Sequence, residues 1–326
     1  MSKLQPREST GYLNFQDQTV QSSLFRNGRV RTQRFLDGSD APMEGVSLVK
    51  REVTIHNARQ LPPSEQTSCH KNGFQLLDAP LTNPEIDFFD HHQVGQQYYA
   101  ECAALVADIT GAKVYAFDHN IRSATGQAAK KQVTGEQKVQ PPIHIVHGDY
   151  TLVSGPQRLK DLTSVPGAND TLRNILPRGQ SLISTRQATN AVQQGRFAII
   201  NVWRSIVPEP VQIHPLALCD GQSVMPQDLV VFEIHYQDRI GENYFAKYSP
   251  HQKWFYYPEM NRDEALLIKQ WDSSGGLAKT NGQQADRDAP DAPCTFSFHS
   301  AFEDPATPIH APDRWSIEVR CMVIYD

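Results

Sequence analysis

The sequence predicts a mainly β protein of mixed α/β content, with a jelly-roll barrel as its core and helices flanking it. Three observations favour this class: many short strand-like segments, a few helical segments between them, and no internal repeat. At 326 residues, the chain can bury a sizeable core without disulfides or a structural metal. We see no linker between two domains, so we expect residues 81–326 to form the barrel domain and residues 1–80 to pack on it as an N-terminal extension.

The elements are expected from the spacing of the apolar residues. Residues 92–109 repeat them at helical spacing and are followed by Gly111, which predicts an amphipathic helix that ends there. Short helical pieces are expected over 156–176, and loops over 123–142 and 273–293, which lack periodicity. The segments that we interpret as strands are 114–117, 143–147, 196–203, 229–236, 253–257, 265–271, 294–302 and 314–325.

Composition and charge narrow the class of protein. The net charge is −5, with 31 basic and 36 acidic residues, whereas a nucleic-acid-binding protein would show a basic excess or stripe. No apolar run approaches the roughly 20 residues of a membrane helix, and residues 1–6 lack the apolar segment of a signal peptide. The five cysteines are scattered, which favours reduced thiols. We therefore expect a cytoplasmic protein that binds neither nucleic acid nor membrane, and a homodimer is left open.

One short motif has the composition of a metal site. His147 and Asp149 end a predicted strand and are two residues apart, so their side chains project to the same face. They can bind one ion as two members of a 2-His-1-carboxylate triad, which leaves open positions on Fe(II). However, 12 His and 36 acidic residues yield about one His-x-acid match by chance. A strand-end histidine beside a hydrogen-bonded aspartate therefore stays an alternative.

The C-terminal region supplies a third candidate ligand and an anion site. His299 lies in a β-rich segment, and the sequence Arg314-Trp315-Ser316 follows 15 residues later. In a strand of period two, Arg314, Ser316, Glu318 and Arg320 share one face, which we expect to point inward because the opposite face is apolar. A buried arginine needs an anion, and its planar fork suits a carboxylate, assisted by the serine hydroxyl. The alternative is that Arg314 pairs with Glu318 on a solvated strand.

The order His-x-Asp, distal His, Arg-x-Ser resembles the Fe(II)/2-oxoglutarate-dependent oxygenases, although 152 residues between the two histidines is more than many members have. Most of residues 85–326 is similar to a narrower group, the hydroxylase/desaturase family of fungal and bacterial secondary metabolism. The blocks that carry this resemblance are YAFDHNIR (115–122), VHGDYT (146–151), NVWR (201–204), PLALCD (215–220), WFYYPEM with DE (254–264), and HSAFEDP with RWSIEVR (299–320).

The resemblance implies a double-stranded β-helix core, of jelly-roll or cupin-like type, over residues 81–326. It also implies a dioxygenase that requires Fe(II), 2-oxoglutarate and O2, and that hydroxylates, desaturates or cyclises a small-molecule secondary metabolite, with succinate and CO2 as co-products. By position, the residues that match the iron ligands are His147, Asp149 and His299, and those that match the 2-oxoglutarate carboxylate site are Arg314 and Ser316.

Several assignments stay open. Arg204 ends an apolar strand, and we expect it to contact the other end of 2-oxoglutarate or the substrate; its alternative is an ordinary strand-end arginine. His235 and His251 are alternative distal iron ligands, although no Arg-x-Ser follows His235. The block 118–122 is expected near the mouth of the site, or else to form a structural ion pair.

Two other functions compete with the dioxygenase. One is an iron oxidase that uses no 2-oxoglutarate, in which Arg314 would be structural. The other is a non-catalytic ligand-binding barrel or an accessory subunit. Formation of succinate by the purified chain would separate these three functions.

Overall fold

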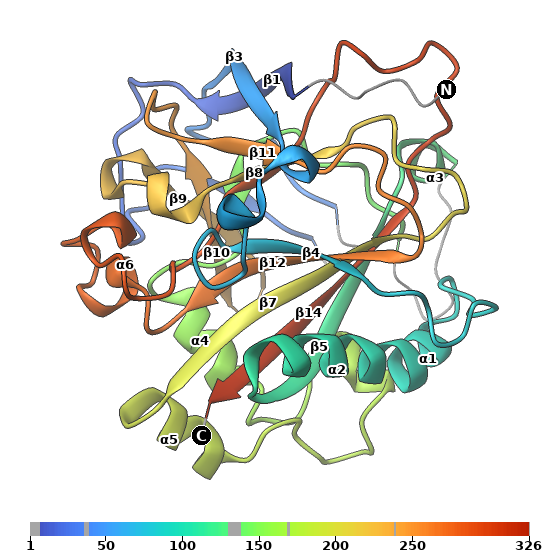
Figure 1. Ribbon diagram of the computed structural model, residues 1–326. Helices are drawn as coiled ribbons and strands as arrows, with labels where there is room; N and C mark the ends of the chain where they lie inside the picture. The colour runs from blue at the N-terminus through green and yellow to red at the C-terminus, as the bar shows by residue number, and fades with distance from the viewer. Residues whose placement is uncertain (1–6, 36–38, 130–137, 168–169, 238, 326) are drawn as a thin grey trace.

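Five strands form an antiparallel sheet in the computed structural model, which describes residues 7–35, 39–129, 138–167, 170–237 and 239–325 (Figure 1). Its central strands are buried almost throughout because both of its faces are covered. The strands, in spatial order, are β4 (Phe74–Asp78), β12 (Glu264–Asp272), β7 (Arg196–Ser205), β14 (Ser316–Tyr325) and β5 (Lys113–Arg122).

The second sheet has nine strands and is mixed, because β11 runs parallel to β3 and β2 parallel to β9. Its strands, in spatial order, are β1 (Glu8–Gln16), β3 (Leu48–Asn57), β11 (Trp254–Tyr256), β8 (Leu216–Cys219), β13 (His299–Ala301), β6 (His147–Gly148), β10 (Ile240–Ala246), β9 (Leu229–His235) and β2 (Arg31–Gln33). Leu218 of this sheet packs with Trp203 and Leu266 of the other, so the two sheets meet face to face.

The predicted helix over 92–109 is confirmed. It begins as α1 (His91–Gln93), passes through a π-helical turn at Val94–Tyr98, and continues as α2 (Tyr99–Thr110). Gly111 ends it in the left-handed conformation, with φ of 66°, which glycine adopts without strain. The other helices are α3 (Ala124–Ala128), α4 (Ser154–Asp161), α5 (Thr185–Gln193) and α6 (Gly276–Lys279). Short 3-10 turns lie at Ala58–Gln60, Pro63–Glu65, Thr171–Asn174, Gly221–Ser223, Pro226–Asp228 and Asp286–Asp288.

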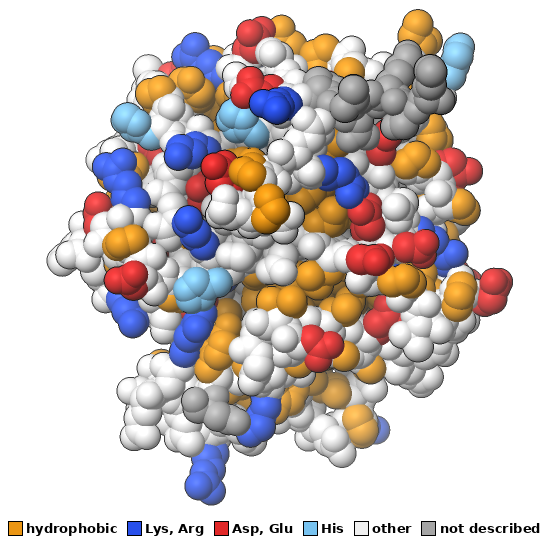
Figure 2. Space-filling model, viewed as in Figure 1, with side chains coloured by type: hydrophobic (Ala, Val, Ile, Leu, Met, Phe, Trp, Pro, Cys, Tyr) orange, Lys and Arg blue, Asp and Glu red, His pale blue; other side chains and the backbone are white. Residues whose placement is uncertain are grey.

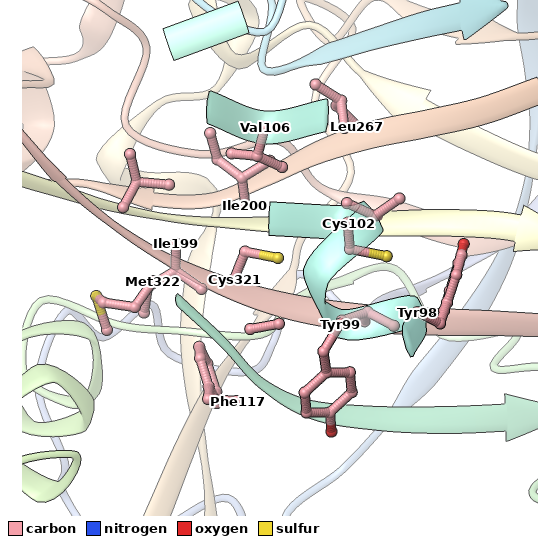
Figure 3. Packing of buried hydrophobic residues seen from close by; sticks show 14 of the residues in the cluster. Tyr98, Tyr99, Cys102, Val106, Phe117, Ile199, Ile200, Leu267, Cys321 and Met322 are labelled. Atoms are coloured by element: carbon pink, nitrogen blue, oxygen red, sulfur yellow. The ribbon is translucent and has the colours of Figure 1, made fainter. Parts of the chain in front are cut away.

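Helices α2, α4 and α5 cover the outer face of the five-stranded sheet, as Figure 1 shows below β7 and β14. Figure 3 shows Cys102 and Val106 of α2 beside Ile200 of β7 and Cys321 of β14. Burying a side chain of this size stabilises the fold by about 1.5–3 kcal/mol. This helical layer leaves the opposite face of the sheet to the second sheet and to the site between them.

Two predicted strands are shorter than expected. Of the first, 143–147, only His147 belongs to β6, because Ile145 and Val146 pair instead with Asn14 of β1. Within 294–302, only β13 forms a regular strand. Before it, the backbone N–H of Ser297 donates to the carbonyl of Lys269, which belongs to the other sheet. The strands from the first 80 residues lie at the ends of the sheets: β1 is one edge of the larger sheet with β3 next to it, β2 is its other edge, and β4 is an edge of the smaller sheet. Among the described residues, no helix has the length and apolarity to cross a membrane.

Candidate functional site

Three of the predicted site residues come together between the two sheets. His147 and Asp149 lie on and just after β6, and His299 begins the adjacent strand β13, where it pairs directly with His147. One donor atom from each of the three lies within 4.8 Å of the others. Within the described ranges, this is the single cluster of three or more His, Cys, Asp or Glu residues that could hold an ion.

The orientation of His147 is set by its own strand. Its Nδ1 lies 2.8 Å from the carbonyl oxygen of Ile145, which leaves Nε2 to face the cluster, 3.6 Å from Oδ1 of Asp149. A ring nitrogen that is held in this way fixes which nitrogen is free to bind a metal. The ring of His299 lies 4.4 Å from that of His147, measured between centroids.

All three donors are in the protonation state that a metal requires. Burial lowers the pKa of His147 to about 4, with help from the neighbouring His299, and burial also lowers the pKa of His299. Burial alone would raise the pKa of Asp149, but the positive charge of Arg320 and the two histidines lower it well below its usual value. At neutral pH the cluster is therefore two neutral imidazoles and one carboxylate, a donor set that suits Fe(II).

A narrow cavity of about 20 Å³ opens beside this cluster. Polar and apolar side chains share its wall, and one end is formed by the two histidines of the cluster. The residues that line it are Arg122, Ile143, His147, Trp203, Leu216, His299, Ala301, Arg314 and Glu318. The cavity therefore adjoins the cluster, and the charged residues Arg122, Arg314 and Glu318 line it.

Arg314 lies in this wall without an anionic partner. Its side chain is 2% exposed, and burial lowers its pKa to about 9, assisted by the charge of Arg122. Nη1 donates to the carbonyl of His214, while Nε has no partner, and the hydroxyl of Ser316 beside it has none either. No carboxylate of the described residues lies within 4.0 Å of the guanidinium, so Arg314 and Glu318 do not form the ion pair considered as an alternative.

The structure does not bring Arg204 to the cavity. Its Nε donates to the hydroxyl of Tyr98 at 2.9 Å, and its Nη1 donates to the carbonyls of Ala79 and Arg262, each at 2.7 Å. The reason is the alternation of β7: Trp203 faces the cavity, so the next residue faces the helical layer. The guanidinium of Arg204 is therefore buried and hydrogen-bonded on the side of β7 that α2 covers, away from the cavity.

The alternative distal ligands also lie elsewhere. His235, at the end of β9, places Nε2 at 2.9 Å from Glu233, and His251 is an exposed residue of the loop before β11. Neither belongs to the cluster that contains His147.

Strand pairing explains which other residues reach the site. Directly opposite residues of antiparallel strands share a face, and three rows across β5, β14 and β7 face the second sheet. The rows are Arg122–Ser316–Ser205, Asn120–Glu318–Trp203 and Asp118–Arg320–Asn201. The period-two pattern of the last strand predicted that Glu318 and Arg320 point inward. Which residues of β5 and β7 face the site follows only from the strand pairing. In the block 118–122, His119 points the other way and contacts Tyr99 at 2.9 Å.

The chain is similar to several known proteins. A family model described as an oxidoreductase/YMDC permease-like domain matches residues 25–324. The Fe(II)/2-oxoglutarate-dependent dioxygenase nvfI of Aspergillus novofumigatus is 30% identical over 278 residues, which cover 83% of this chain and 82% of that protein. The hydroxylase/desaturase poxK of Penicillium oxalicum is 31% identical over 274 residues, covering 77% and 71% respectively.

Solved structures show the same fold. A structure titled iron and alpha-ketoglutarate-dependent endoperoxidase NvfI superposes with a TM-score of 0.70 at 23% identity, and covers 98% of each chain.

Among the sequence relatives, an uncharacterised protein of Methylophilus leisingeri is 40% identical over 196 residues, which cover 60% of this chain and 89% of that protein.

Proposed function

Because this chain belongs to the hydroxylase/desaturase family of Fe(II)/2-oxoglutarate-dependent oxygenases, we propose that it oxidises a small-molecule secondary metabolite in the cavity between its two sheets. The enzyme depends on Fe(II), 2-oxoglutarate and O2. The observation that carries the proposal is the convergence of three deprotonated metal donors beside Arg314, a buried arginine that no carboxylate of the described residues neutralises.

His147, Asp149 and His299 would hold the iron. Three protein donors leave three coordination positions for co-substrate and oxygen, and the bound iron, together with 2-oxoglutarate and O2, supplies the oxidising chemistry with succinate and CO2 as co-products. The chain's own contribution is to orient its ligands and to keep water away. Both histidines are less than 6% exposed, which supports a site closed to bulk solvent.

Arg314 and Ser316 would bind the far carboxylate of 2-oxoglutarate. The free Nε and the free hydroxyl are the donors that such a carboxylate needs, and both residues are nine-tenths buried or more. The carbonyl of His214 and the ring of Trp203 hold the guanidinium from its other sides. We leave Arg204 out of this assignment because its donors are already used outside the cavity.

The architecture is best described as a double-stranded β-helix. Its support is the winding of the chain: β5, β6, β7 and β8 alternate between the two sheets, and β12, β13 and β14 alternate again. We further propose that residues 81–326 form this oxygenase domain and that residues 1–80 are an extension packed on it. The edge positions of β1, β2 and β4, with β3 next to β1, support that division.

The substrate is proposed to be a small molecule held partly by apolar contacts. Ile143, Leu216 and Ala301 form the apolar part of the cavity wall, and the relatives carry the names hydroxylase/desaturase, dioxygenase and endoperoxidase. Figure 2 shows acidic and basic side chains interspersed on the face in view. Together with the net charge of −5, this distribution disfavours nucleic acid as a partner.

The experiment is a turnover assay on the purified chain alone. Supplied with Fe(II), 2-oxoglutarate and O2, it should form succinate, slowly without substrate and faster with a candidate metabolite. Anaerobic addition of 2-oxoglutarate to the Fe(II) protein should also produce the weak visible band of the chelate. A chain that binds iron but produces neither band nor succinate would contradict the dependence on 2-oxoglutarate.

A further inference from the structure

The two carboxylate oxygens of Asp149 have different surroundings. Oδ1 faces the other donors of the cluster, 3.6 Å from Nε2 of His147. Oδ2 points toward the five-stranded sheet, where it accepts a hydrogen bond from Nδ2 of Asn201 at 3.0 Å and lies 3.6 Å from Nε of Arg320. One oxygen is therefore available to a metal, while the other accepts one hydrogen bond and lies beside a guanidinium, both from the opposite sheet.

The buried position of Asn201 is not explained by a contribution to the stability of the fold. Its side chain is fully buried, and its Oδ1 has no hydrogen-bond partner. An amide whose carbonyl is left unpaired in the interior is costly for folding. What the amide does provide is the single donor bond to Asp149, so its placement points to a role at the site.

Arg320 is fixed from its far end. Its Nη1 donates to Oδ2 of Asp118 at 2.8 Å, and the amide oxygen of Asn120, in the orientation that satisfies both residues, accepts from Nη1 and Nη2 at 2.8 and 2.9 Å. Asp118 is itself anchored by the hydroxyl of Thr171. With its outer nitrogens bound in this way, the guanidinium cannot swing away, and its Nε stays directed at Asp149.

Asn201 and Arg320 stand directly opposite each other on β7 and β14, so they approach Asp149 from one rigid surface. We propose that these two are positioning residues that hold Oδ2 and thereby keep Asp149 a one-oxygen ligand of the iron. The inference rests on the proposed function, because it presumes that His147, Asp149 and His299 bind the metal. A carboxylate can bind a metal through one oxygen or both, and only the first leaves three positions open on a six-coordinate ion.

Counting the water molecules bound to the metal tests this directly. Mn(II) would be loaded in place of Fe(II), and its bound waters counted from the broadening of the electron paramagnetic resonance lines in 17O-labelled water. The parent should show three waters. Asn201→Leu, which has nearly the same shape and lacks the donor, should show two, and 2-oxoglutarate should bind its Mn(II) form about tenfold more weakly, the lower end of what such supporting contacts contribute at metal sites.

Gln270→Met is the matched control. Gln270 accepts a hydrogen bond from the backbone N–H of Asp149 at 3.1 Å and does not touch the carboxylate, so this variant should keep three waters. Arg320→Met would leave Asp118 and Asp149 without their cation and is at risk of not folding; Arg320→Lys keeps the charge and should fall between parent and Asn201→Leu in its 2-oxoglutarate affinity.

The outcomes separate the inference from the proposed function. Three waters in Asn201→Leu, with unchanged 2-oxoglutarate affinity, would overturn the positioning role and leave the metal site intact. If Asp149→Ala bound Mn(II) as tightly as the parent, the metal site itself would be wrongly assigned. Two waters in Gln270→Met as well as in Asn201→Leu would point to general loosening and would also count against the role proposed for the Asn201 amide.

Discussion

The guanidinium of Arg314 lies over the indole ring of Trp203, 5.8 Å from the ring centre, and its buried Nε forms no hydrogen bond with any described residue. Cation–π contact and the bond to the His214 carbonyl hold the group in place without neutralising it. A structural ion pair would already contain its carboxylate, so the surroundings of Arg314 support the anion site proposed for it.

Arg314→Ala should therefore weaken 2-oxoglutarate binding and leave iron binding intact. Truncating one partner of a buried charge pair costs about 2–5 kcal/mol, which corresponds to a roughly 30- to 3,000-fold higher Kd. The measurement is the anaerobic titration of 2-oxoglutarate into the Fe(II) protein. Arg204→Lys changes another buried arginine outside the cavity and should titrate like the parent; the same Kd for Arg314→Ala and the parent would move the anchor elsewhere.

Replacing any one of His147, Asp149 and His299 with Ala should remove most of the bound iron and all turnover, because a site with two protein donors holds a divalent ion weakly. Iron content after gel filtration and succinate formation are the measurements. His235→Ala and His251→Ala, which alter histidines outside the cluster, should keep full iron content. Stoichiometric iron in His299→Ala, together with loss in one of these two, would identify a different third ligand.

Local spacing predicts that two pairs of the proposed site residues share a strand face, whereas the assignment of His299 follows from the resemblance. His147 and Asp149 are two residues apart on one strand, and Arg314 and Ser316 share a face by the same rule. The rule does not say which face of a strand points inward. On β7, Trp203 and Arg204 alternate, and both faces are buried, so the inward position of the tryptophan depends on α2 covering the other side.

The N-terminal strands and the support of Asp149 depend on pairing between distant segments. β1 and β3 join the larger sheet through β11, which follows almost 200 residues later in the chain. In the same way, Asn201 meets Arg320 only because β7 pairs with β14. Spacing within one segment carries no information about such partners, which is why the sequence indicated the proposed metal donors but not the pairing of the residues proposed to position Asp149.

The buried His119 should make the free energy of unfolding depend on pH. Burial lowers its pKa to about 4, while the unfolded chain titrates near 6.5. Below pH 6.5 the unfolded state therefore binds the proton more readily, and stability falls until about pH 4, by roughly 3 kcal/mol in total. Urea unfolding at several pH values should show a smaller loss for His119→Gln than for the parent. His251→Gln, at an exposed position, should follow the parent curve, and identical curves for all three would contradict the assignment.

The last prediction concerns the contact between α3 and the segment that carries Arg314. A Cβ on Gly126 would lie 2.2 Å from the ring of Trp315, so Gly126→Ala has to displace the indole that stands between Arg314 and Ser316. Overpacking of this kind typically costs about 1–3 kcal/mol of stability, and here the shift reaches the proposed carboxylate site. We expect a higher Kd for 2-oxoglutarate with unchanged iron content, measured by the same anaerobic titration. Gly167→Ala, where an added Cβ meets no atom within 4 Å, is the control and should match the parent. If Gly126→Ala lost stability but bound 2-oxoglutarate as the parent does, Trp315 would support the fold without positioning the anchor.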